Sequence, residues 1–203
     1  MQGFILNTQL VREEDLIVTI LTKNKVLRLY RFYGARHSTI NIGFLIDFEE
    51  EETDRNLNRL RNVIQIGFPF LLDNYRMLIW QNFIKLLYPH FFEVDNINNF
   101  YFEMLENIIK NFDRDPKRVL IENYLNLLQF EGRLHLNFEC FLCEKKIYNR
   151  VNIVRGYLTA CENCIPQKGF ELEKIESLFY NKKTTLLNDN EIEKLFNILK
   201  LGI

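Results

Sequence analysis

Two Cys-x-x-Cys pairs carry the clearest chemistry in the chain. Cys140 and Cys143 form the first pair, Cys161 and Cys164 form the second, and the chain has no other cysteine. The 17 residues between the pairs lie within the spacing typical of four-cysteine zinc sites. Two such pairs can direct four thiolates at one tetrahedral ion, with Zn–S distances of about 2.3 Å. We therefore predict one structural Zn²⁺, which contributes folding energy because four protein ligands leave no open coordination position.

Three other uses of these cysteines stay open. They can be reduced, partly buried thiols without metal, ligands of an iron–sulfur cluster, or a redox Cys-x-x-Cys. The redox use is disfavoured because neither pair begins a helix after a core strand, as thioredoxin-like chemistry requires. Structural disulfides are disfavoured because the chain is expected to stay in a reducing compartment.

No other group of residues supports catalysis. The three histidines (His37, His90 and His135) lie far apart in the sequence, and no phosphate-binding glycine loop is present. The acidic run from Glu49 to Glu52 can in principle bind Mg²⁺, but such runs usually form a solvated face. We predict a protein that is not an enzyme and has no small-molecule substrate. The rival enzymatic hypothesis is a nuclease that uses the acidic run, and it predicts Mg²⁺-dependent turnover.

Basic residues gather near the N-terminus and alternate with aromatic ones. The candidate DNA-binding residues are Lys23, Lys25, Arg28, Arg31, Arg36 and His37. Strand alternation places Arg28, Tyr30 and Phe32 on one face, and Arg31 on the other. A basic face with exposed rings holds single strands by phosphate pairing and base stacking. The alternative is that the rings fill the protein core and the arginines are only solvated.

The first 68 residues are expected to form a small β-barrel. Short apolar or alternating blocks with β-branched residues predict strands. These blocks cover residues 4–6, 16–21, 26–33, 44–51 and 62–66. No helical pattern long enough for a crossover interrupts them, so five strands in this length indicate a closed barrel such as an OB-fold.

Residues 69–203 are expected to form a helical domain with an inserted zinc module at 138–166. Helical spacing predicts helices at 71–92, 98–112, 115–132, 170–180 and 188–201. Asp115 followed by Pro116 is typical of a helix start, and Asn188 with Glu191 resembles a capping box. Residues 145–160 are expected to form a short hairpin between the cysteine pairs. The predicted fold class is therefore α+β.

Composition limits the class of protein further. The 203 residues are 47% hydrophobic and 26% charged, which is typical of globular proteins. The net charge of -1 gives no whole-molecule attraction to a polyanion, so a nucleic-acid surface must be local. No stretch approaches the roughly 20 apolar residues of a membrane span, and no signal or transit peptide is evident. We expect a cytoplasmic protein without membrane contact.

Two N-terminal motifs resemble those of the bacterial recombination mediator family RecO. Residues 14–22, Glu-Asp-Leu-Ile-Val-Thr-Ile-Leu-Thr, are similar to the second strand of that family, and residues 34–38, Gly-Ala-Arg-His-Ser, are similar to its Gly-Ala-Arg turn. The order of barrel, helices, four-cysteine module and helices is also similar. The resemblance therefore spans essentially the whole chain.

The resemblance implies a nucleoid-associated protein of recombinational DNA repair. It implies binding of single- and double-stranded DNA, annealing of complementary strands, and help in loading RecA onto protein-coated single strands. The implied partners are RecR and the single-stranded-DNA-binding protein. The alternative is a zinc-containing protein-interaction module without DNA binding.

Overall fold

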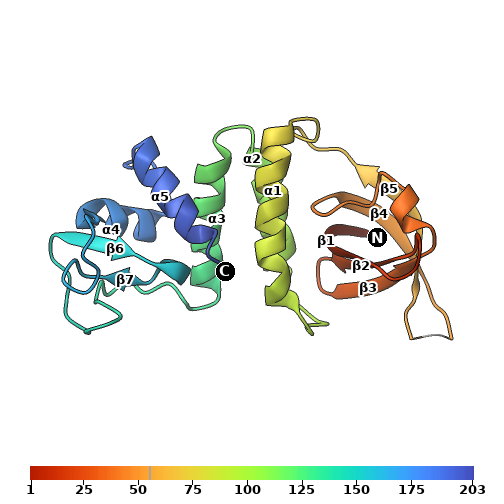
Figure 1. The fold of residues 1–203 in the computed structure, drawn as a ribbon, viewed down its shortest axis with the longest axis horizontal. Coiled ribbons are helices and arrows are strands. Elements are labelled where there is room, and N and C mark those ends of the chain that lie inside the picture. Colours follow the sequence, from red (N-terminus) through yellow and green to blue (C-terminus); the bar gives the residue numbers. More distant parts are fainter. Residues whose placement is uncertain (55) are drawn as a thin grey trace. The chain divides into compact units, whose positions relative to one another are not determined.

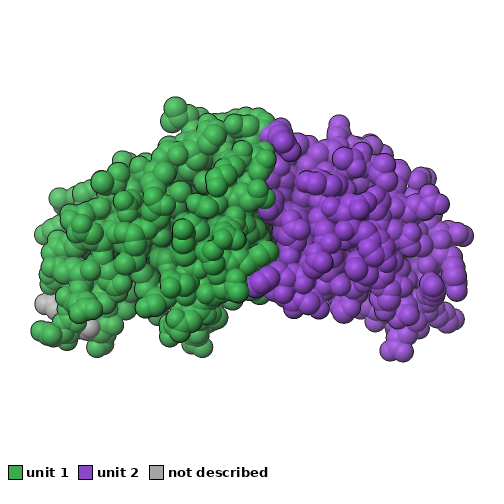
Figure 2. Space-filling model, turned by 180° about the vertical axis from the view of Figure 1, so that it is seen from behind, with its two compact units in different colours: residues 1–113 green, residues 114–203 purple. Residues whose placement is uncertain are grey.

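The computed structural model describes residues 1–54 and 56–203. The described chain folds into two compact units, residues 1–113 and residues 114–203, which are coloured separately in Figure 2. Figure 1 shows the barrel and two helices of the first unit, and the helices and small sheet of the second. The division expected from the sequence, residues 1–68 and 69–203, stays a prediction.

Five strands of the first unit form a closed barrel in the order β1-β2-β3-β5-β4. Their bounds are β1 Gln2–Leu10, β2 Leu16–Leu21, β3 Val26–Arg31, β4 Leu45–Glu51 and β5 Arg59–Ile66. All neighbours are antiparallel except β3 and β5, which run parallel where Tyr30 pairs with Arg59. This five-stranded barrel confirms the predicted OB-fold class.

The barrel interior follows from strand alternation. Val18 on β2 pairs with Leu29 on β3, and both side chains are buried in the core together with Phe48 of β4. Strand β5 begins three residues earlier than the expected residue 62, because its pairing with β4 continues to Glu51 and Arg59. Charged residues at this end of β5 hide the apolar pattern by which a strand is recognised.

Helix α1 spans Asn74–Leu87 and α2 spans Phe100–Asn111. The expected helix at 71–92 is wrong at both ends. Asp73 caps α1 by accepting a hydrogen bond from the Arg76 backbone N–H at 3.0 Å. After α1 the chain continues as a short 3₁₀ turn, η2, at Tyr88–Phe91. Pro89 ends the α-helical bonding because proline has no backbone N–H to donate.

Trp80 of α1 connects this helix to the barrel. Its side chain is fully buried, and its indole Nε1–H donates to the carbonyl oxygen of Gly43 at 2.8 Å. The rings of Phe4 from β1 and Phe112 from the end of α2 lie 6.1 Å from the Trp80 ring. Aromatic packing and one buried hydrogen bond therefore fix α1 against the turn before β4.

The second unit combines three helices with a small sheet. Its helices are α3 Pro116–Phe130, α4 Leu172–Asn181 and α5 Asp189–Leu199, and a 3₁₀ turn, η3, spans Arg155–Tyr157. The sheet has the order β7-β6-β8, with β6 Arg150–Ile153, β7 Thr159–Ala160 and β8 Phe170–Glu171. The antiparallel pair β6 and β7 confirms the expected hairpin. The helix expected from residue 170 begins at Leu172, because Phe170 pairs with Val151 in the sheet.

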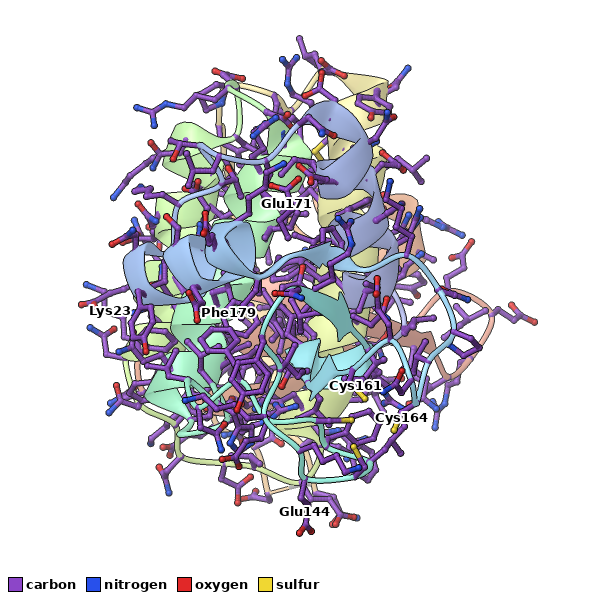
Figure 3. All side chains as sticks on the ribbon, turned by 90° about the vertical axis from the view of Figure 1, so that its left-hand side faces the viewer. Lys23, Glu144, Cys161, Cys164, Glu171 and Phe179 are labelled. Carbon is purple, nitrogen blue, oxygen red and sulfur yellow. The ribbon has the colours of Figure 1, made fainter. Side chains whose placement is uncertain are left out.

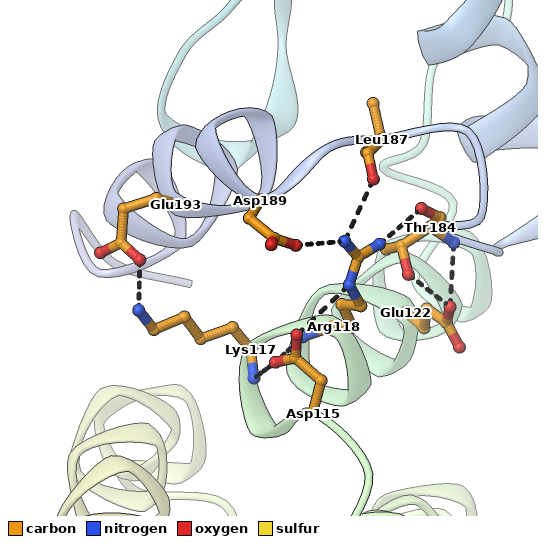
Figure 4. Close-up of polar contacts among 8 residues, drawn as sticks. All are labelled: Asp115, Lys117, Arg118, Glu122, Thr184, Leu187, Asp189 and Glu193. Atoms are coloured by element: carbon orange, nitrogen blue, oxygen red, sulfur yellow. Dashed lines mark hydrogen bonds and ion pairs between the residues drawn. The ribbon is translucent and has the colours of Figure 1, made fainter.

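Polar contacts connect α3 to the segment before α5 and to α5 itself (Figure 4). The Arg118 guanidinium donates to the carbonyl oxygens of Thr184 and Leu187 at 2.9 and 3.1 Å, and it pairs with Asp189 at 2.8 Å. Asn188 and Glu191 form the predicted capping box at the start of α5. None of the described helices is long and apolar enough to cross a membrane.

Candidate metal centre and nucleic-acid surface

The four cysteines come together at one point in the second unit. One sulfur from each of Cys140, Cys143, Cys161 and Cys164 lies within 4.8 Å of all the others. The Cys143 and Cys161 sulfurs are 3.8 Å apart. A tetrahedron with Zn–S bonds of about 2.3 Å has edges of about 3.8 Å, whereas a disulfide bond is about 2.05 Å long. The spacing therefore fits four ligands around one metal ion.

Local backbone hydrogen bonds shape the first cysteine pair. The Cys140 N–H donates to the Lys145 carbonyl at 2.9 Å, and the Glu144 N–H donates to the Cys140 carbonyl at 2.7 Å. Glu144 has a left-handed backbone conformation, with φ 61°, which closes this turn. The Phe141 N–H donates to the Thr159 carbonyl on β7 at 2.9 Å. The small sheet thereby holds the first pair beside the second.

The second pair directly follows β7, and Figure 3 labels its two cysteines. The backbone N–H groups of Cys164 and Ile165 both donate to the Cys161 carbonyl, at 3.1 and 3.0 Å. The two pairs therefore fold as separate turns, one on each side of the β6–β7 hairpin. Sequence spacing predicted this arrangement.

The surroundings of Cys140 and Cys164 shift the pKa values of these two thiols in opposite directions. Burial disfavours the Cys140 thiolate, but backbone N–H groups of Cys161, Leu142 and Cys143 point at its sulfur and lower its pKa below the usual value. Hydrogen bonds with the Cys143 and Cys161 side chains raise the pKa of Cys164. A divalent cation at their centre would favour the thiolate form of all four. The four cysteines therefore have the ligand set and the spacing to hold one metal ion.

Four of the six candidate DNA-binding residues lie beyond the two ends of β3. Lys23 and Lys25 are exposed in the β2–β3 turn, and Figure 3 labels Lys23. Arg36 and His37 are exposed at the 3₁₀ turn η1, Gly34–Arg36, beyond the other end of β3. A six-residue strand is roughly 20 Å long, so these groups form two separate clusters.

The two arginines of β3 itself differ in their surroundings. Arg28 is exposed and lines a hollow of about 330 Å³ beside Glu93 and Asp95. Arg31 is half-buried, and its guanidinium donates to the Leu60 carbonyl at 3.0 Å. Burial lowers the pKa of Arg31. Arg31 therefore has a structural contact with β5, while Arg28 faces solvent.

Arg36 is tied to the loop between β1 and β2. Its guanidinium lies 2.5 Å from a carboxylate oxygen of Glu14 and 5.3 Å from the ring centre of Tyr33. The hydrogen bond to Glu14 raises the pKa of Arg36. About two thirds of its side chain remains exposed, so an incoming phosphate can still approach it.

One hollow on the barrel contains residues that sequence reasoning did not group. It has a volume of about 400 Å³ and is lined by Arg12, Tyr30, Phe32, Asn56, Leu57 and Arg59. Tyr30 and Phe32 are half-buried and line the hollow, so they do not fill the barrel interior. Alternation indicated that these two rings share a face, but nothing in the sequence brings the two arginines to them.

The acidic run on β4 has basic and amide partners. Glu51 lies 2.8 Å from Arg61 and 3.6 Å from Arg59, and Glu49 accepts a hydrogen bond from Asn62 at 2.6 Å. The hydrogen bond from Arg61 lowers the pKa of Glu51. These contacts between β4 and β5 give the run a role in holding the two strands together.

Fold and site together define an α+β protein in which a five-stranded barrel precedes a helical region with a four-cysteine metal site. Residues 1–71 match the family model described as "RecO N terminal". The barrel is therefore similar to the N-terminal domain of RecO proteins. No curated protein matches the chain.

Proposed function

We propose that this chain is a recombinational DNA repair mediator. It binds single- and double-stranded DNA, anneals complementary strands, and helps to load RecA onto single strands coated by the single-stranded-DNA-binding protein. It acts with RecR and with that coating protein, and it catalyses no reaction. The observation that carries the proposal is the match of residues 1–71 to the RecO N-terminal family, on a closed five-stranded barrel.

Phosphate contacts are assigned to exposed basic residues of the barrel. Lys23 and Lys25 contact the DNA backbone from the β2–β3 turn, and Arg36 and His37 contact it from η1. Arg28 contributes from the outer face of β3. Such contacts neutralise phosphates and carry little base information, which suits a protein that acts on any sequence. Arg31 contributes less directly, since its guanidinium is engaged with the Leu60 carbonyl.

The four cysteines are assigned to one Zn²⁺ with a structural role. A zinc ion held by four thiolates offers no site for water or substrate. It fixes the β6–β7 hairpin, whose two strands of four and two residues are too short to be stable by themselves. The support for this proposal is the 3.8 Å separation between the Cys143 and Cys161 sulfurs.

The proposal is tested by fluorescence anisotropy of a labelled single-stranded oligonucleotide over a salt series. Wild-type protein should bind with an affinity that falls with salt. The double variant Arg28→Glu and Arg36→Glu should bind more weakly and reduce the salt slope by about 1.4, if each residue meets one phosphate. Lys110→Glu on α2 reverses an exposed charge in the same unit and is the control. Absence of salt-dependent binding by the wild type contradicts the proposal.

The alternative function is a protein-interaction module without DNA binding. Exposed Phe141 and Leu142, between the two cysteines of the first pair, favour it, because apolar groups at such a position suit a protein contact. The same titration separates the two functions. Only the alternative predicts that the wild type fails to bind the oligonucleotide at every salt concentration.

A further inference from the structure

The turn that follows β3 is held from the loop between β1 and β2. The buried carboxylate of Asp15 accepts hydrogen bonds from the Tyr30 hydroxyl at 2.5 Å and from the Tyr33 backbone N–H at 2.8 Å. The Ala35 N–H donates to the backbone carbonyl of Glu14 at 3.0 Å. None of these bonds uses an atom of the Glu14 side chain. They therefore keep the backbone of Glu14 beside η1 even when that side chain is changed.

The side chain of Glu14 pairs with the guanidinium of Arg36. A carboxylate oxygen of Glu14 lies 2.5 Å from Nε of Arg36, and the Tyr33 ring centre lies 5.3 Å from the same guanidinium. Of the six candidate DNA-binding residues, Arg36 is the one that forms an ion pair in the part of the chain that the structure describes. The side chain of Arg36 is 65% exposed and that of Glu14 is 32% exposed, so an ion from solution can reach both.

A carboxylate and a phosphate bind a guanidinium in the same way. Both anions accept charge-assisted hydrogen bonds from neighbouring N–H groups, and arginine pairs with either in a two-bond geometry. Glu14 lies at the Nε–H of Arg36, so a phosphate that uses this N–H has to displace the carboxylate. The contribution of Arg36 to DNA binding is then the difference between two ion pairs.

We propose that Glu14 competes with DNA phosphates for Arg36 and thereby limits the affinity of the barrel for DNA. This inference rests on the proposed function and adds a residue that weakens DNA binding to those that carry it. A protein that pairs strands has to leave them afterwards, and an internal anion that takes Arg36 back favours this release. The Tyr33 ring stays beside the guanidinium in both pairings, because the Tyr33 N–H remains bonded to Asp15.

The test compares two neutral replacements in the same loop, by fluorescence anisotropy of a labelled single-stranded oligonucleotide at low salt. Glu14→Gln keeps the size of the side chain but removes its charge. It should tighten binding about 2- to 5-fold, which corresponds to about 0.4–1 kcal/mol and lies within the range of exposed ion pairs. Glu13→Gln is the matched control, because it removes the same charge from an exposed neighbour that has no ion pair in the described part of the chain. It should change the affinity less, since it lowers only the general repulsion from DNA.

A double-mutant cycle assigns the gain to Arg36. Arg36→Gln removes the group for which the two anions compete, so Glu14→Gln added to it should have no more effect than Glu13→Gln added to it. Equal affinities of Glu14→Gln and Glu13→Gln would overturn the inference. Weaker binding by Glu14→Gln, or a gain that persists beside Arg36→Gln, would overturn it as well.

These outcomes are distinct from failure of the proposed function. Salt-dependent binding by the wild type leaves that function standing even when Glu14→Gln shows no gain. If the wild type binds the oligonucleotide at no salt concentration, the proposed function fails and the inference fails with it. Circular dichroism shows whether Glu14→Gln is folded. If it is not, Glu14→Asp provides the same comparison, because its shorter side chain moves the carboxylate away from Arg36 and should also tighten binding.

Discussion

Replacing Gly43 with alanine should weaken the connection between α1 and the barrel. Gly43 has a left-handed backbone conformation, with φ 85°, in the turn before β4. A Cβ atom added there would lie 2.7 Å from Nε1 and 2.9 Å from Cδ1 of Trp80. The same indole nitrogen donates to the Gly43 carbonyl at 2.8 Å. The substitution therefore disturbs both the backbone and a buried hydrogen bond.

The expected loss of stability has two parts. A non-glycine residue in a left-handed conformation costs about 1–2 kcal/mol. Forcing a methyl group into a packed interior costs about 1–3 kcal/mol, and the fully buried Trp80 ring has little room to move away. The sum is about 2–5 kcal/mol, a large fraction of the about 5–15 kcal/mol that stabilises a typical domain.

The assay is urea unfolding followed by the fluorescence of Trp80, which is the only tryptophan in the chain. Gly43→Ala should lower the unfolding midpoint strongly. Gly67→Ala is the matched control, because a Cβ there meets nothing within 4 Å and its φ is not positive. In a double-mutant cycle, followed by circular dichroism, Trp80→Phe should remove part of the penalty of Gly43→Ala. Equal midpoints for Gly43→Ala and Gly67→Ala would show that the close approach of Gly43 to Trp80 does not limit the residue at position 43.

Two further predictions concern the metal site and pH. Elemental analysis should find about one zinc per chain. Cys143→Ser should lose this zinc and lower the melting temperature far more than Thr185→Ser, a change at an exposed residue. A folded wild-type protein without metal would contradict this prediction. The hydrogen bond from the Tyr30 hydroxyl, and then that from the Tyr33 N–H, lower the pKa of Asp15 against the effect of burial. The stability that this carboxylate contributes is therefore present above about pH 4, and it is lost as pH falls through the folded-state pKa. Asp15→Asn should therefore be less stable than wild type at neutral pH, and the difference should shrink on acidification; a constant difference would argue against the ionised carboxylate as its source.

The parts of the fold that depend on residues close together in the sequence could be predicted from the sequence. The apolar run at Leu16–Leu21 and the alternation after Val26 gave β2 and β3, because a strand in a barrel buries one face. The cysteine cluster was also predictable, since each pair closes its own turn. Asn188 and Glu191 predicted the capping box at the start of α5, because this motif spans only four residues.

Features set by distant contacts were missed or misplaced. Strand β8 is stabilised by pairing with β6, so Phe170 reads as the start of a helix in the sequence alone. The start of β5 at Arg59 is set by Glu51 on the neighbouring strand. The barrel hollow needs Arg12 and Arg59 to meet two rings of β3, and no local pattern predicts that meeting. Most of the structure that could not be predicted from the sequence therefore depends on pairing between residues that are far apart in the chain.

Strand annealing by the protein tests the proposed mediator function most directly. Complementary labelled oligonucleotides are mixed with and without protein across a salt series, with ATP present or absent, and pairing is followed by energy transfer. A mediator that anneals strands should accelerate pairing without ATP, and this acceleration should fall as salt weakens phosphate contacts. Uncatalysed pairing should show the opposite trend, because salt screens repulsion between the strands. Absence of acceleration at every salt concentration would contradict the proposed mediator function.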